Sequence, residues 1–283
     1  MVQMPSDLPK LPRSWKHRYP FRLGTTSFIY PASYQENVAI LAPHLDEIEL
    51  LMFESQPPSC PDGALVNDLR RLGQSHGVTY NIHLPTDLDL THRDKRVRHQ
   101  ACRVLKAFVT TLAPLNPTVY VLHLPPPDKL CRGDDLLAWQ CTAANTLENI
   151  LETGLAPRRL ALENLFFPFE WLTPLVERFD LGVCLDIGHL ALQKADLEAF
   201  LKQHGHRIMI AHLHGLRDSK DHSSLGGLPP AYRPLLTEWL GCFEGSVSLE
   251  VFGFDPLLTS LICLEDWMSS WDERFYPEKR GRG

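Results

Sequence analysis

Eight short apolar segments, distributed along nearly the whole chain, constrain its fold more than any other feature of the sequence. Each segment is rich in β-branched or aromatic residues, and most end at Gly or Pro, as is typical of strands buried in a parallel sheet. They span residues 21–28, 46–54, 78–85, 118–125, 159–166, 181–188, 208–215 and 246–253. We interpret all eight as β-strands.

A helical pattern follows each of these segments, because apolar residues recur there at three- and four-residue spacing. The predicted helices span residues 33–45, 64–75, 94–112, 135–151, 171–179, 197–203, 232–243 and 257–271. Eight strands that each precede a helix predict an α/β protein with a closed (β/α)₈ TIM barrel, not an open doubly wound sheet. The length of 283 residues suits this fold, which typically needs about 250.

The ends of the chain and its composition argue against a secreted protein, a membrane protein and a protein whose main partner is nucleic acid. We expect an N-terminal extension at 1–20, one barrel domain at 21–272 and a C-terminal tail at 273–283. The polar, Pro-rich start lacks a signal peptide's apolar core, and no apolar stretch approaches the ~20 residues of a membrane span, so we expect a cytoplasmic protein without a membrane partner. The seven cysteines form no CxxC motif, and the net charge of −6 argues against nucleic acid as the main partner.

Six consecutive predicted strands carry an imidazole or a carboxylate near their C-terminal ends, where the active site of a TIM barrel gathers. These side chains are His83, His123, Glu163, Asp186, His212 and Glu250. Three more candidates follow the sixth and seventh strands in the chain, namely His189, Asp221 and His222. The sequence therefore predicts a site at this end of the barrel.

Metal binding is the interpretation that explains these residues together. A lone histidine before Leu-Pro is compatible with a core hydrogen bond, and a lone glutamate with an interior ion pair. However, Glu163, Asp186 and Glu250 in one barrel mouth bring like charges close together, which is costly unless cations neutralise them. The strands contain almost no Arg or Lys. Mixed imidazole and carboxylate ligands favour Zn²⁺, then Mn²⁺ or Fe²⁺, over Mg²⁺ or Ca²⁺.

At these residues the chain resembles the xylose isomerase-like TIM barrels and, within them, the endonuclease IV branch. The resemblance covers residues 21–270 and implies two or three divalent metal ions. One would be held by His83, His123 and Glu163, a second by Glu163, Asp186, His212 and Glu250, and a third by His189 and His222 with a nearby aspartate. In that branch the aspartate lies two residues before the last histidine, where this chain has Lys220, so Asp221 or Asp218 is the expected replacement.

The same reasoning names catalytic and substrate-binding candidates. A carboxylate such as Glu163 that bridges two ions is the standard arrangement for attack at phosphorus, and we expect Asp186 and Glu250 to share the catalytic role. The candidates for substrate binding are Thr25, Thr26, Ser27, Glu54, His214, Arg217 and Lys220. Each has an alternative role, because hydroxyl groups also bond to nearby backbone and charged loop residues are often simply solvated.

Four functions are weighed against these residues. The superfamily's sugar isomerases and epimerases use only the quartet Glu163, Asp186, His212 and Glu250, so the additional histidines favour phosphoester hydrolysis. The endonucleases carry long loops and basic surfaces, whereas this chain has short loops and an acidic balance. Residues 23–31, 37–38 and 49–55 are similar to the cobamide-remodelling phosphodiesterases. That resemblance implies a corrinoid substrate. Hydrolysis of the phosphoester in its nucleotide loop would release the lower-ligand nucleoside and leave cobinamide phosphate. A non-catalytic corrinoid-binding protein is the fourth interpretation, and it has no need of tightly held zinc.

Overall fold

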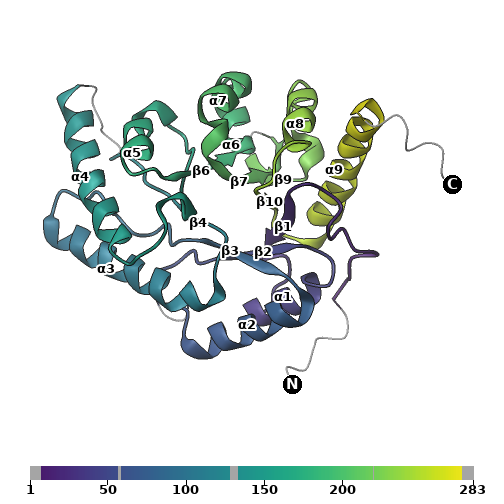
Figure 1. Ribbon diagram of the computed structural model, residues 1–283, viewed down its shortest axis with the longest axis horizontal. Helices are drawn as coiled ribbons and strands as arrows, with labels where there is room; N and C mark the ends of the chain where they lie inside the picture. Colours follow the sequence, from purple (N-terminus) through teal and green to yellow (C-terminus); the bar gives the residue numbers. More distant parts are fainter. Residues whose placement is uncertain (1–7, 57–58, 128–132, 219, 276–283) are drawn as a thin grey trace.

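A computed structural model describes residues 8–56, 59–127, 133–218 and 220–275, which form a closed barrel of parallel strands surrounded by helices (Figure 1). The strands are β1 (Arg22–Thr26), β2 (Glu47–Leu51), β3 (Thr79–His83), β4 (Tyr120–Leu122), β5 (Leu160–Glu163), β6 (Gly182–Asp186), β7 (Ile208–Leu213) and β10 (Ser246–Leu249). Their order is β1-β10-β7-β6-β5-β4-β3-β2, which confirms the predicted (β/α)₈ barrel. Residues 1–7 of the predicted extension and 276–283 of the predicted tail lie outside the described residues.

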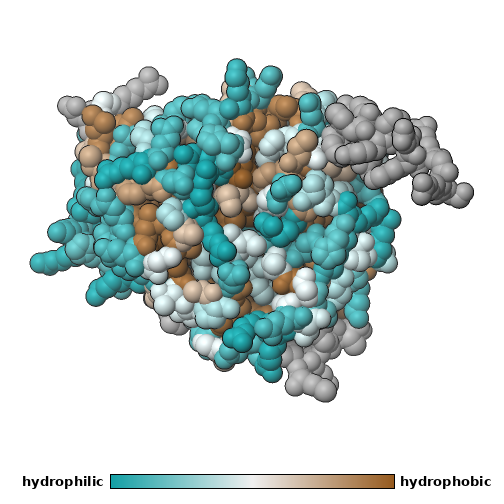
Figure 2. Space-filling model, in the orientation of Figure 1, coloured by the Kyte–Doolittle hydropathy of each residue, from teal (hydrophilic) through white to brown (hydrophobic). Residues whose placement is uncertain are grey.

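Helices follow the strands at the predicted places. They are α1 (Tyr34–Leu41), α2 (Gly63–His76), α3 (Lys95–Leu112), α4 (Asp134–Leu151), α5 (Thr173–Arg178), α7 (Leu197–His204), α8 (Tyr232–Leu240) and α9 (Phe254–Phe275). Short 3₁₀ helices are η1 (Ala113–Leu115), η2 (Pro157–Arg159), η3 (Phe169–Trp171), η4 (Gly205–Arg207) and η5 (Leu225–Gly227). Ser33 begins α1 through a capping box with Glu36, as expected for this residue pair. On the face shown in Figure 2, hydrophilic residues cover most of the outer helices, and hydrophobic ones show between them.

Two elements near the site were not anticipated from the sequence. Helix α6 (Ile187–Gln193) starts directly after β6, because Oδ1 of Asp186 accepts a hydrogen bond from the backbone N–H of His189 at 2.6 Å and so caps the helix. After β7 the chain forms an antiparallel hairpin of β8 (Gly215–Arg217) and β9 (Lys220–Ser223), outside the barrel sheet. Both elements follow strands that carry candidate ligands.

The described part of the N-terminal segment packs against the barrel. The side chain of Trp15 is fully buried, and its backbone N–H donates to the carbonyl of His44 at 2.9 Å. Leu11 is buried in the same core. Among the described residues, no helix combines the length and the apolar character that crossing a membrane requires.

Candidate metal centre

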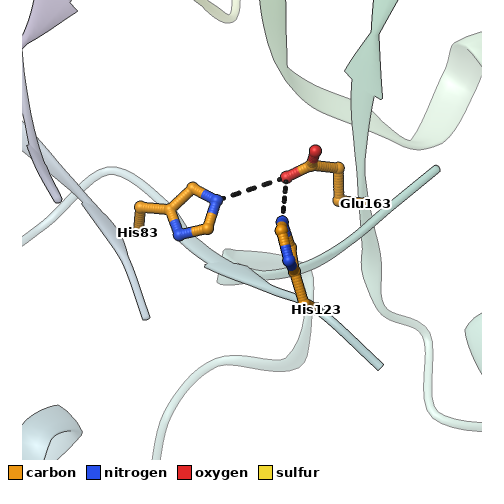
Figure 3. Close-up of side chains that lie close together, drawn as sticks. All are labelled: His83, His123 and Glu163. Carbon is orange, nitrogen blue, oxygen red and sulfur yellow. Dashed lines mark hydrogen bonds and ion pairs between the residues drawn. The ribbon is translucent and has the colours of Figure 1, made fainter. Parts of the chain in front are cut away.

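The first cluster consists of His83, His123 and Glu163, which come from the ends of β3, β4 and β5. One oxygen of Glu163, Oε2, lies 3.0 Å from Nε2 of His123 and 3.4 Å from Nε2 of His83 (Figure 3). Nδ1 of His83 lies 3.1 Å from the carbonyl oxygen of Leu84, so this nitrogen is the donor and Nε2 remains the ring atom that faces the cluster. The three side chains offer ligand atoms within 4.8 Å of one another.

The second cluster joins Glu163 to Asp186, His212 and Glu250. Nδ1 of His212 lies 3.1 Å from Oε2 of Glu250 and 3.7 Å from Oε2 of Glu163. It also lies 3.9 Å from Oδ2 of Asp186. The other ring nitrogen, Nε2, lies 2.9 Å from Oε1 of Glu49, to which it donates. In neutral His212, Nδ1 therefore presents a lone pair to three carboxylates.

Two atoms of the second cluster test whether a cation fits there. Nδ1 of His212 and Oε2 of Glu250 are both buried, and neither has a hydrogen-bond partner among the described residues. Two facing acceptors in a buried site repel each other unless a proton or a cation lies between them. The donor set of imidazoles and carboxylates is the set that suits divalent transition metals. The residues therefore fit a divalent cation.

The third cluster consists of His189 on α6 and of Asp221 and His222 on β9. Nε2 of His189 lies 3.7 Å from Oδ2 of Asp221, and Nε2 of His222 lies 3.9 Å from the same atom. The Nδ1 atoms are engaged elsewhere: that of His189 lies 3.0 Å from the carbonyl oxygen of Asn164, and that of His222 lies 3.2 Å from the carbonyl oxygen of Glu250. Both rings thus turn their free nitrogen toward Asp221.

The hairpin decides which acidic residue stands near these two histidines. Asp221 is the aspartate of the third cluster, whereas Lys220 and Asp218 are exposed. His222 adopts a backbone φ of 52°, a left-handed conformation that is uncommon for residues other than glycine. Such strain is maintained when surrounding contacts hold the residue, and here its own Nδ1 contact to the carbonyl of Glu250 does so.

In the first and third clusters, the pKa values of His189 and of Glu163 shift in opposite directions, so that histidine protons neutralise the carboxylate charge. Burial raises the pKa of Glu163, but His123, His189 and His83 outweigh this effect and hold the pKa well below its ordinary value. Burial lowers the pKa of His189, yet Asp186 and Glu163 outweigh it and raise the pKa to about 10. Protonated imidazoles therefore neutralise the carboxylates, and bound divalent cations would displace these protons.

Cys184 lies beside the second cluster without contributing a thiolate. Its ligand atom groups with those of Glu163 and His212 within 4.8 Å, and its Sγ lies 3.6 Å from Nε2 of His212. Burial raises the pKa of the Cys184 thiol well above its ordinary value. The sulfur therefore stays protonated in this environment.

Glu49 on β2 was missed by the sequence reasoning as a site residue. It is fully buried and accepts hydrogen bonds from Nε2 of His212 and from Oγ of Ser248, the latter at 2.6 Å. The available signal was the spacing of Glu47 and Glu49 in an apolar strand. Side chains two residues apart point to the same face of a strand, and here that face is the barrel interior.

Asn164 was also missed as a partner of Asp186. Its Nδ2 donates to the carbonyl of Asp186 at 2.9 Å, and its Oδ1 accepts from the backbone N–H of Asp186 at 2.7 Å. This two-way bond joins the ends of β5 and β6. It holds the backbone from which Asp186 and α6 start.

The residues predicted to bind substrate lie in two kinds of place. Thr25 and Thr26 are buried, and their hydroxyls donate to the carbonyls of Leu249 (2.8 Å) and Val251 (3.0 Å). Ser27 is buried too, and its hydroxyl accepts from a β2 backbone N–H at 3.1 Å. These three hydroxyls thus join β1 to its neighbours.

Of the remaining candidates, Glu54, Arg217 and Lys220 are exposed, and none of them lines the cavity above the clusters. His214 is fully buried, and its Nε2 lies 3.0 Å from Oδ2 of Asp186. The structure therefore places His214 beside a candidate ligand and leaves the other three outside the cavity lining.

A cavity of about 800 Å³ opens above the first and third clusters. His83, His123, Glu163, His189, His222 and Glu250 reach it from the barrel mouth. Its walls are aromatic, with Phe53, Phe166, Phe167, Trp171 and Phe252. No Lys or Arg is among the described residues that line it.

Comparison with known proteins finds the same fold. The family described as "Xylose isomerase-like TIM barrel" matches residues 44–256. Similar solved structures include a D-tagatose 3-epimerase-like protein, at 19% identity and a TM-score of 0.73 over 90% of this chain and 99% of that one. Endonuclease IV from Thermus thermophilus matches at 19% identity and a TM-score of 0.67, over 88% and 99% of the two chains.

D-psicose 3-epimerase from Clostridium cellulolyticum has a TM-score of 0.64 at 16% identity, over 88% of this chain and 92% of that one. No curated protein matches the chain in sequence. At these identities the solved structures show a common fold, while the family match spans most of the chain. The chain therefore belongs to the xylose isomerase-like TIM barrel family.

Proposed function

We propose that this protein is a metal-dependent phosphodiesterase that hydrolyses the nucleotide-loop phosphoester of a cobamide and releases the lower-ligand nucleoside and cobinamide phosphate. The observation that carries the proposal is the position of His83, His123 and His222. All three line the cavity, although none belongs to the quartet that the superfamily's sugar isomerases use. Ligating histidines beyond the quartet supply further cation sites, which hydrolysis of a phosphoester uses and isomerisation does not.

The three clusters would hold divalent ions, and zinc suits their donor atoms best. When bound, such ions polarise phosphoryl oxygens and lower the pKa of a nearby water toward neutrality. Glu163 is the shared ligand, because its Oε2 faces the first and second clusters while its Oε1 lies 3.3 Å from Nδ1 of His189. Asp221 completes the third cluster in place of the aspartate found two residues before the histidine in endonuclease IV.

The chain's own groups orient the reacting water and the phosphate. Oε2 of Glu250 is a buried acceptor that lacks a hydrogen-bond partner among the described residues, and Glu250 lines the cavity. We assign this oxygen to the second ion, together with Nδ1 of His212, and the other carboxylate oxygen of Glu250 to accept a hydrogen bond from the attacking water. Asp186 faces the same ring nitrogen of His212, at 3.9 Å, and its Oδ2 is held by His214.

The cavity favours a cobamide over DNA. Binding a DNA backbone relies on Lys and Arg side chains that neutralise phosphates, and the described cavity lining contains neither. A volume of about 800 Å³ falls in the range of pockets that enclose ligands of drug size, so it suits the nucleotide portion of the substrate. The corrin ring would remain outside, at the rim.

Sugar epimerisation is the second candidate, because the quartet Glu163, Asp186, His212 and Glu250 is present and several similar structures are named as epimerases. The test is to incubate zinc-loaded protein separately with adenosylcobalamin, a DNA duplex with an abasic site, and D-tagatose, and to identify the products by mass spectrometry. Metal-free protein is the control.

We expect zinc-dependent release of the nucleoside from the cobamide only. Nicking of the DNA alone would replace the proposed substrate, and conversion of the ketohexose alone would assign the site to epimerisation. Tight corrinoid binding by protein that holds no zinc would identify a non-catalytic binding protein.

A further inference from the structure

Phenylalanine side chains gather at the barrel mouth, although water-exposed aromatic rings are normally scattered. Phe166 is 60% exposed, Phe252 is 43% exposed and Phe28 is 41% exposed. They follow β5, β10 and β1, so they come from separate parts of the chain that meet only at this end of the barrel. Exposed apolar groups that converge at a cavity are typical of a ligand-binding surface.

Two of these rings border the third cluster. The ring centroid of Phe166 lies 4.5 Å from that of His189, and the centroid of Phe252 lies 5.1 Å from that of His222. The two histidine rings are 6.4 Å apart, and both phenylalanines line the cavity. The third cluster therefore has a phenyl ring at each of its two ends.

The two phenylalanines have different aromatic neighbours along the cavity wall. Phe252 belongs to a row of rings, with Phe53 at a centroid distance of 6.1 Å and Phe28 a further 5.3 Å along. Phe166 is followed in the chain by Phe167, which packs on Trp171 at 6.0 Å. The parts of the cavity wall around Phe166 and Phe252 are apolar, so they offer few hydrogen-bond partners to the hydroxyl groups of a free sugar.

We propose that Phe166 and Phe252 are specificity-determining residues that select a phosphate ester carrying a planar, unsaturated ring, by stacking on that ring beside the third cluster. The inference rests on the proposed function for the position of the phosphate. Aromatic rings gain roughly 0.5–1.5 kcal/mol from stacking beyond the burial of their area, whereas a puckered ring of the same size gains only the burial. The selected group is a flat ring of the kind found in a nucleotide base.

Phenyl phosphate and cyclohexyl phosphate are the probes that isolate planarity, because they share a phosphate and a six-carbon ring. Their Kd values are measured by calorimetry on zinc-loaded protein. We expect wild-type protein to bind phenyl phosphate roughly tenfold more tightly. Phe166→Leu and Phe252→Leu keep an apolar side chain, and each should reduce this preference to about two- to threefold with little change for cyclohexyl phosphate.

Ile262→Ala is the matched control, since Ile262 is an exposed apolar residue on α9 that does not line the cavity. It should keep the wild-type preference. Equal binding of the two probes by wild-type protein, or an unchanged preference in both leucine variants with full zinc content, would overturn the proposal. If the protein prefers phenyl phosphate but cleaves no phosphodiester, the stacking site stands and the proposed function is wrong. If it cleaves the phosphodiester but binds both probes equally, the proposed function stands and the stacking site is wrong.

Discussion

Nε2 of His214 donates to Oδ2 of Asp186 at 3.0 Å, and this bond connects the second cluster to the hairpin that carries the third. The other nitrogen of the ring, Nδ1, accepts the backbone N–H of His222 at 2.9 Å. Because Nδ1 is an acceptor, the ring proton of neutral His214 must be on Nε2. His214 is therefore a positioning residue, with both nitrogens engaged by protein groups.

Two substitutions of His214 each remove one of its two hydrogen bonds and keep the other. In His214→Asn the amide oxygen can replace Nδ1, so the contact to the hairpin stays and the donor to Asp186 is lost. In His214→Gln the amide nitrogen can replace Nε2, so the donor to Asp186 stays and the contact to the hairpin is lost. Removing a partner that orients a metal ligand typically costs about 10–100-fold in metal affinity.

We expect Asn to weaken zinc at the second cluster and Gln to weaken zinc at the third. Competition titration with a chromophoric chelator, together with zinc content by mass spectrometry, measures both. Wild-type affinity at every site in both variants would show that neither bond of His214 positions a ligand.

Gly188 has no side chain, and the ring of His214 occupies the space where a Cβ atom would lie. A Cβ atom added at Gly188 would lie 1.9 Å from Cε1 of His214, so Gly188→Ala must displace the ring. We expect a loss of zinc affinity at least as large as in His214→Asn. Gly205→Ala is the control, because that glycine has ordinary helical angles and no atom near an added Cβ. Equal zinc content and activity in the two alanine variants would contradict this prediction.

Glu49 orients His212, whereas Glu47 lies deeper in the barrel and contacts no described candidate ligand. Glu49→Ala leaves Nε2 of His212 without its acceptor, so the ring can turn or change tautomer, and we expect about 10–100-fold weaker zinc binding. Glu47→Ala removes hydrogen bonds to Thr79, Thr118 and Asn81. It should lower the melting temperature and leave zinc affinity close to wild type. The same loss of zinc in both variants would point to general destabilisation.

Glu163 is the carboxylate shared by the first and second clusters. Glu163→Gln keeps the size of the side chain but removes the negative charge and one acceptor oxygen. We expect activity on the phosphodiester to fall below detection and the zinc content per chain to drop. Full activity with an unchanged zinc content would exclude a shared ligand at this position.

The protons of the site predict how the stability of metal-free protein depends on pH. The pKa of His189 is raised from 6.5 to about 10 in the folded state, so the stability it contributes is fully present below pH 6.5 and is lost as the pH rises toward 10. The pKa of Glu163 is lowered from 4.5, so its contribution is present above pH 4.5 and is lost on acidification below that value.

We therefore expect the melting temperature of metal-free protein to fall between pH 6.5 and about 9.5, within the range set by His189. Zinc-loaded protein should show a smaller fall, because a ligating imidazole has no extra proton to lose. Differential scanning calorimetry of both forms over this range makes the comparison. An equal alkaline loss in the two forms would show that His189 does not bind zinc.

Local patterns in the chain were sufficient for the architecture and for most of the candidate ligands. The β-branched and aromatic composition of the eight segments identifies the strands, and the barrel rule then places His83, His123 and Glu163 at one end. These inferences succeed because each depends on residues near one another in the chain and on one rule of the fold. Helix α6 was missed although its cap is local, because Asp186 is equally compatible with a strand end.

Only the tertiary structure decided which side chains meet. Glu49 and His212 are 163 positions apart, and their 2.9 Å contact exists because closing the barrel brings β2 and β7 to one interior. The hairpin fold likewise selects Asp221 over Asp218, and the loops after β5 and β10 bring Phe166 and Phe252 to the same cavity. Such contacts depend on strand closure and loop path, which no local period in the sequence specifies.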